Sequence, residues 1–115
     1  MNQKQYELAF SILKNDCKIR HRYVNKNGET CAIGALAEAT GVWVTPGYHK
    51  YGNSRKIGLH NGGGRLAGKF GLSLTELSYI QEANDAHSSR ERRVKAVLEA
   101  LDAIATRHGL NVLGG

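Results

Sequence analysis

The sequence lacks the features that mark membrane, secreted and disulfide-rich proteins. No apolar run reaches membrane-spanning length and the N-terminus has no signal-peptide core, so we expect a cytoplasmic protein without a membrane role. Only two cysteines are present, Cys17 and Cys31, and in the cytoplasm we expect both to be reduced. The histidines show no paired helix-face spacing for a metal, so no metal site and no cofactor are predicted.

Negative charge is missing from the middle of the chain. Between Glu38 and Glu76 there is no Asp or Glu, although nine glycines and several aromatic residues stand there. Such a stretch cannot neutralise its own cations, so it either meets a negative partner or stays exposed to solvent. The basic residues of this stretch are Lys50, Arg55, Lys56, Arg65 and Lys69.

What is present indicates one folded domain. The 115 residues are 41% hydrophobic and carry a formal net charge of +6, and no linker or repeat divides them. We predict a single globular domain over residues 1–115, with a flexible, basic, glycine-rich segment at about 45–69. The predicted fold class is mainly α (α+β), with about four helices, a short β-hairpin or strand, and a long Gly-rich basic loop.

The helices are predicted from apolar spacing and capping residues. Helical spacing begins near the N-terminus and resumes after Thr30, a capping residue, until Gly41 offers a left-handed stop. Ser73 and Ser88 each precede a glutamate by three residues, which is the pattern of a capping box at a helix start. The four predicted helices cover residues 3–15, 30–41, 73–83 and 88–108.

The glycine-rich stretch contains the spacing of a phosphate-binding loop. Gly63 to Lys69 reads glycine, four residues, glycine, lysine. Phe70 stands where serine or threonine would ligate magnesium, so we expect a plain flexible loop rather than a nucleotide-hydrolase site.

Two groups of cations have the pattern of an anion-binding surface. Residues 18–25 alternate basic with apolar residues before an Asn27-Gly28 turn, which predicts a strand or hairpin arm with one basic face. This face and the loop cations could follow a phosphate backbone while Tyr51 stacks on a base; a solvated basic surface is the alternative. Arginines at the start of the last helix favour a bound anion unless nearby acidic residues compensate. The predicted contact residues are Lys18, Arg20, Arg22, Lys50, Tyr51, Arg55, Lys56, Arg65, Lys69, Arg90 and Arg93.

Cys31 offers an enzymatic alternative. It stands in the first turn of a predicted helix, where a thiol becomes more acidic, and His60 could serve as its base with Asp85 as an orienting group. Its neighbours Ala32 and Ile33 instead suit a small, buried packing residue. Both interpretations stay open.

The chain resembles a group of small, uncharacterised bacterial and phage proteins. The shared features are the helix that begins Cys31-Ala-Ile-Gly-Ala-Leu36 and the later Asn84-Asp85 pair, with Ala83 where that group often has tryptophan. The resemblance implies a phage or mobile-element origin and a helical architecture, and it implies no catalytic activity. From the residues alone, the Asn-Asp pair is predicted to break the helix before it and to act as a cap.

These observations favour a non-enzymatic, small basic binding protein. Its expected partner is nucleic acid, or an acidic surface of a nucleic-acid-handling or host-defence complex, which includes an inhibitor of the anti-CRISPR kind. The alternative is a small cysteine-dependent enzyme that uses Cys31 with His60. A third interpretation is a structural protein that forms a homodimer through an apolar helix face.

Overall fold

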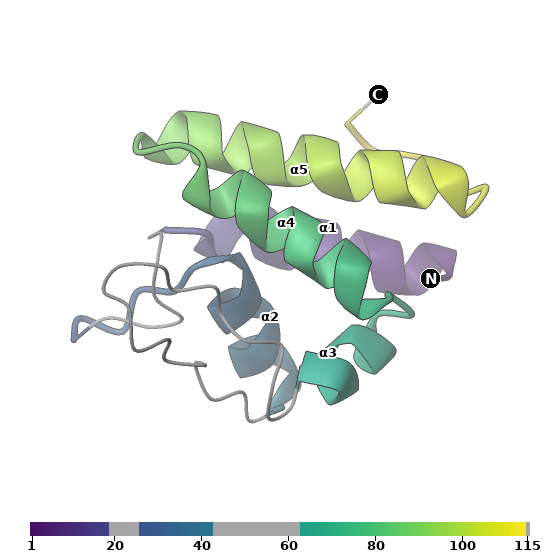
Figure 1. The fold of residues 1–115 in the computed structure, drawn as a ribbon, viewed down its shortest axis with the longest axis horizontal. Helices are drawn as coiled ribbons and strands as arrows, with labels where there is room; N and C mark the ends of the chain where they lie inside the picture. Colours follow the sequence, from purple (N-terminus) through teal and green to yellow (C-terminus); the bar gives the residue numbers. More distant parts are fainter. Residues whose placement is uncertain (19–25, 43–62, 115) are drawn as a thin grey trace.

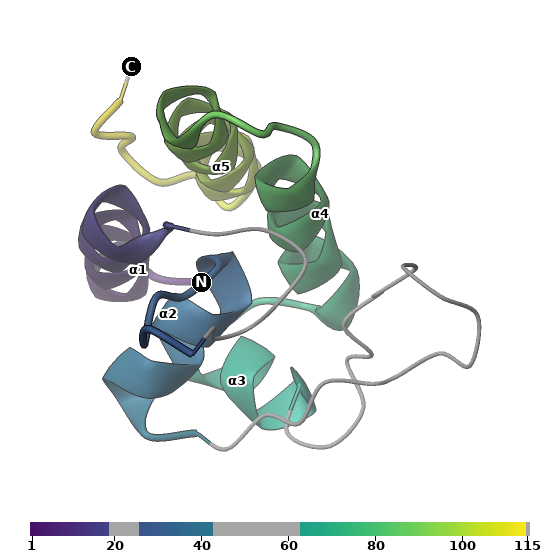
Figure 2. The same ribbon diagram turned by 90° about the vertical axis from the view of Figure 1, so that its left-hand side faces the viewer.

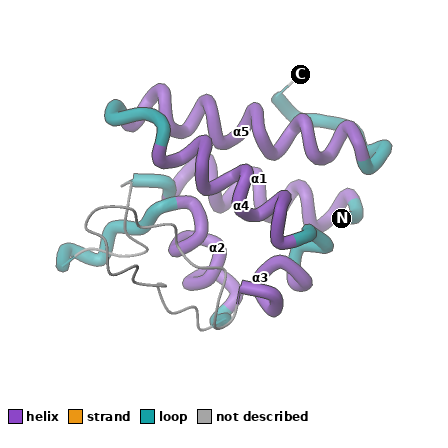
Figure 3. Tube along the Cα trace, viewed as in Figure 1, coloured by secondary structure: helices purple, strands orange, loops and turns teal. Residues whose placement is uncertain are grey.

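The computed structural model describes residues 1–18, 26–42 and 63–114 (Figure 1). The predicted hairpin arm and most of the Gly-rich loop fall on residues 19–25 and 43–62, outside the described residues. The mainly α prediction is confirmed, because helices dominate the described part and no strand occurs there (Figure 3). The five helices are α1 (Gln3–Asp16), α2 (Ala32–Thr40), α3 (Gly63–Lys69), α4 (Leu74–Asp85) and α5 (Arg90–Arg107).

The three longer helices form one layer, and the two shorter helices lie on one side of it. α5 packs against α1 and α4 and runs antiparallel to both (Figures 1 and 2). α2 contacts α1 and α4, and α3 contacts α2 and α4. No helix of the described part has the length and apolar character needed to span a bilayer.

The core is built from the predicted apolar stripes. On α1 the side chains of Tyr6 and Leu13 are fully buried, and on α5 Val97, Leu101 and Ile104 repeat at helical spacing toward them. Each apolar side chain of this size contributes roughly 1.5–3 kcal/mol when it is buried. The amphipathic stripes therefore explain why both helices form and why they pack together.

Two of the predicted helix boundaries are confirmed. At the start of α4, the backbone N–H of Glu76 donates to Ser73 Oγ (3.1 Å), and Glu76 Oε1 accepts from the N–H of Ser73 (2.9 Å). This is the capping box that the sequence predicted. Gly41 ends α2 with a φ of 70°, in the left-handed region.

Other boundaries differ from the prediction. Ser89 rather than Ser88 caps α5, accepting from the N–H of Arg92 (3.2 Å). Thr30 does not cap α2, because its hydroxyl donates to the carbonyl of Asp16 (2.8 Å). Cys31 takes the cap position instead, and its Sγ accepts from the N–H of Gly34 (3.4 Å).

The segment with phosphate-loop spacing is a helix rather than a flexible loop. Leu66 and Ala67 bury one side of α3, and Phe70 directly after it is fully buried. The residue that departs from the nucleotide-binding pattern is thus a core residue. Burial of these side chains offsets the low helix propensity of the glycines.

α4 continues through the Asn84-Asp85 pair, so the predicted break at this pair is wrong. The helix ends one residue later, with Ala86 as its C-cap. Asn84 is fully buried and has partners on other elements. Such long-range contacts outweigh the local preference of Asn for caps and turns.

Candidate nucleic-acid interface

The excess positive charge lies almost entirely outside the described helices. Residues 19–25 and 43–62 hold five of the sixteen lysines and arginines and none of the ten carboxylates. The described residues hold the other eleven cations and all ten carboxylates, which leaves them +1 of the formal charge of +6. The helical body is therefore nearly neutral, and the two cationic stretches supply the remainder.

Five of the eleven predicted contact residues lie in the described part, and they do not form one surface. Arg65 and Lys69 lie on α3, where the Lys69 carbonyl accepts from Gln5 Nε2 near the start of α1 (3.1 Å). Lys18 and Arg90 lie at the opposite end of α1, which is about 20 Å away for a helix of this length (Figure 1). The other six lie outside the described residues: Arg20, Arg22, Lys50, Tyr51, Arg55 and Lys56.

Arg93 is buried, which corrects its predicted place on an anion-binding surface. Only 4% of the residue is exposed, and its guanidinium donates to three backbone carbonyls. Nη1 reaches Lys18 (2.8 Å), Nη2 reaches Ser88 (2.9 Å) and Nε reaches His87 (3.3 Å). These carbonyls follow the C-terminal ends of α1 and α4, where helix dipoles favour a cation.

A sequence signal for this burial was present. Arg93 precedes Val97 by one helical turn, and Val97, Leu101 and Ile104 form the buried stripe of α5. Extending the stripe by four residues places position 93 on the inward face. The predicted role as a surface cation overlooked this periodicity.

Arg93 and Arg90 join the end of α1 to the start of α5. Arg90 Nη2 donates to the carbonyl of Asn15 (3.3 Å), and Arg90 itself is exposed. Lys14 is also exposed and lies in the last turn of α1, one residue before Asn15. We call Lys14, Asn15, Arg90 and Arg93 the α1–α5 junction. Lys14 was not among the predicted contact residues.

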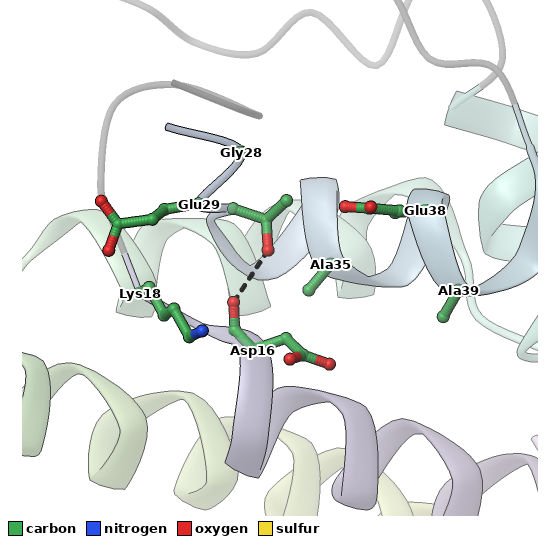
Figure 4. Close-up of a pocket in the computed structure, with 8 residues that line it drawn as sticks. Asp16, Lys18, Gly28, Glu29, Ala35, Glu38 and Ala39 are labelled. Carbon is green, nitrogen blue, oxygen red and sulfur yellow. Dashed lines mark hydrogen bonds between the residues drawn. The ribbon is translucent and has the colours of Figure 1, made fainter. Parts of the chain in front are cut away.

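Lys18 lies beside a pocket rather than on an open cationic face (Figure 4). The pocket has a volume of about 290 Å³ and is bordered by the end of α1, residues 28–30 and one side of α2. Its charged lining residues are Asp16, Lys18, Glu29 and Glu38. Three carboxylates against one ammonium make this pocket unsuited to a phosphate.

Asn84 links α4 to the N-terminus of α2. Its Oδ1 accepts from the N–H of Ala32 (3.0 Å) and from Cys17 Sγ (2.7 Å). One turn earlier, Gln81 Oε1 accepts from the N–H of Ile33 (3.2 Å). Asp85 Oδ1 in turn accepts from the amide nitrogens of both Gln81 and Asn84. Side chains of α4 thus satisfy the unpaired N–H groups that begin α2.

The same network argues against Cys31 as a nucleophile. Cys31 is fully buried, and burial raises the pKa of its thiol to about 12. Burial and the neighbouring Cys31 raise the pKa of Cys17 to about 12 as well. Both thiols are protonated near neutral pH, and Asp85 orients amide groups in the interior. His60 lies outside the described residues.

In the described ranges, no three His, Cys, Asp or Glu side chains are arranged to hold a metal ion. Comparison with known protein families, curated proteins and solved structures found no match to this chain. The resemblance to small phage proteins stays a prediction. The functional argument therefore depends on the residues of this chain alone.

Proposed function

We propose that the protein is a non-enzymatic basic binding protein that engages the phosphate backbone of nucleic acid. The observation that supports this proposal is the distribution of charge. A nearly neutral helical body is joined to two stretches, 19–25 and 43–62, that contain five cations and no carboxylate. Cations without neighbouring anions are free to replace the counterions of a polyanion.

The proposal predicts a measurable salt dependence. If all five cations of these stretches meet phosphates, log K against log[salt] has a slope of about −4.5 for duplex DNA and about −3.5 for a single strand. A tyrosine in the second stretch, Tyr51, is expected to stack on an unpaired base, which favours the single strand. Base-specific readout forms no part of the proposal.

Binding is favoured over catalysis by the state of the thiols. The enzymatic alternative needs an accessible thiolate at Cys31, whereas this thiol is buried and has a pKa of about 12. The resemblance to phage proteins suggests where such binding would act, namely on a nucleic-acid-handling or host-defence complex. In that setting an acidic protein surface is the alternative target.

The test is a titration of a fluorescein-labelled oligonucleotide, single-stranded and duplex, followed by anisotropy from about 50 to about 200 mM NaCl. We expect binding at low salt that weakens steeply as salt rises. An affinity that does not change with salt, or no binding at low salt, would contradict the proposal. Material recovered with the protein from cells at low salt, and lost after nuclease treatment, would support nucleic acid over an acidic protein.

A further inference from the structure

The α1–α5 junction brings together cations that are far apart in the sequence. Lys14 and Arg90 are both exposed, and Arg90 Nη2 donates to the carbonyl of the residue after Lys14. The two helices run antiparallel, so the last turn of α1 lies beside the first turn of α5 (Figure 2). Neither cation has a carboxylate within 4 Å in the described part of the chain.

The junction is held from inside by Arg93. Its guanidinium connects the carbonyl of Lys18, directly after α1, with the carbonyls of His87 and Ser88, directly before α5. A planar fork with several fixed donors can hold three carbonyls in this way, whereas the single ammonium of lysine cannot reproduce the geometry. Arg93 therefore sets the position of the end of α1 relative to the start of α5.

We propose that Lys14 and Arg90 form a phosphate-binding surface at the α1–α5 junction and that Arg93 acts as its positioning residue. This inference rests on the proposed function, and it adds a site on the helical body to the two cationic stretches. The partner is the sugar-phosphate backbone of a nucleic acid, recognised by charge. Lys18 is left out because its neighbours in the pocket are Asp16, Glu29 and Glu38.

The two helices supply a matched control for this surface. Lys4 near the start of α1 and Arg107 at the end of α5 are also exposed, and they lie at the far ends of the same helices. Lys14→Gln/Arg90→Gln and Lys4→Gln/Arg107→Gln therefore remove the same charge from different ends of the molecule. A difference between the two variants reports the site of contact and not the net charge.

The experiment measures anisotropy of a labelled single-stranded oligonucleotide over a salt series for both double variants. We expect Lys14→Gln/Arg90→Gln to reduce the salt slope by about 2, one for each lost phosphate contact, while Lys4→Gln/Arg107→Gln stays close to the wild-type slope. If the wild-type protein binds and both variants behave alike, the junction is not a contact surface. If the wild-type protein does not bind, the proposed function itself fails.

The role of Arg93 is tested by a change that keeps its charge. Arg93→Lys should lower the slope as Lys14→Gln/Arg90→Gln does, and should add no further loss when combined with it. A purely structural role would lower the melting temperature and leave the slope of the folded protein unchanged, which would overturn the positioning role. Additive losses in the combined variant would overturn it too. If Arg93→Lys does not fold, Arg93→Met, with an apolar side chain of similar length, takes its place.

Discussion

Asn84, in the last turn of α4, accepts a hydrogen bond from the backbone N–H of Ala32, the first residue of α2 (3.0 Å). The cap of one helix is thus supplied by the side chain of another. Because Cys17 also donates to this oxygen, a single buried amide joins the end of α1, the start of α2 and the end of α4. We regard this amide as the central polar contact of the fold.

Replacing this amide should destabilise the protein. Asn84→Ala leaves the N–H of Ala32 and the thiol of Cys17 buried without their acceptor, at a cost of about 2–4 kcal/mol in the free energy of unfolding. Urea unfolding followed by circular dichroism measures the change. Asn15→Ala is the control, because the side chain of Asn15 is exposed and its loss should cost less than about 0.5 kcal/mol. Equal costs for the two variants would show that Asn84 has no special role.

The Asn84 contact also shows the limit of what the sequence predicts. The helices α1 and α5 and the capping box at Ser73 depend on neighbours within a few residues, so periodicity and capping patterns were sufficient to predict them. The role of Asn84 depends on a residue 52 positions away, and local pattern favoured a helix break there. Local preference says nothing about a partner that only packing supplies.

The candidate surface was predictable to a similar degree. The cationic character of the chain follows from counting residues, and it led to Lys18, Arg90 and Arg93 as contact residues. Their fates differ because of tertiary structure: Arg93 is buried, Lys18 borders an acidic pocket, and Arg90 remains exposed. Charge in a sequence predicts the sign of a partner, while the placement of each cation depends on the fold.

The buried thiols should make the protein less stable at alkaline pH. Burial raises the pKa of Cys17 and of Cys31 from 9.0 to about 12, so the folded state holds these protons more tightly than the unfolded state. Stability from this source is complete below about pH 9 and is lost as pH rises toward about 12. Tyr6, whose pKa burial raises from 10.0 to about 12, adds the same trend above pH 10.

Urea unfolding at about pH 7, 9 and 10 measures this alkaline loss. A Cys17→Ala/Cys31→Ala variant should show a smaller decline between about pH 9 and 10, because only Tyr6 then contributes. Alkylation by iodoacetamide should be slow in the folded protein and fast in urea, since the thiolate is the reactive form. Rapid alkylation of the native protein at neutral pH would show that at least one thiol is accessible, and would revive the enzymatic alternative.

Glu76 should contribute stability that is lost in acid. Burial alone would raise the pKa of this carboxyl, but hydrogen bonds from Ser73 and His108 outweigh it and lower the pKa below 4.5. Its contribution is therefore present above about pH 4.5 and declines as pH falls through the lowered value. We expect Glu76→Gln to cost about 1 kcal/mol at neutral pH and less at about pH 3. A cost that is equal at both pH values would show that the charge of Glu76 contributes nothing.

The two groups of cations in the glycine-rich part of the sequence should differ in their effect on binding. Arg55 and Lys56 belong to the stretch that has no carboxylate, whereas Arg65 and Lys69 lie on α3, away from the α1–α5 junction. Arg55→Gln/Lys56→Gln should therefore reduce the salt slope by about 2, and Arg65→Gln/Lys69→Gln by less than about 1. Both variants lose the same charge, so a simple effect of net charge would change them equally. A larger loss for the α3 pair would place the nucleic acid at the opposite end of the body from the junction, and would contradict the proposed surface.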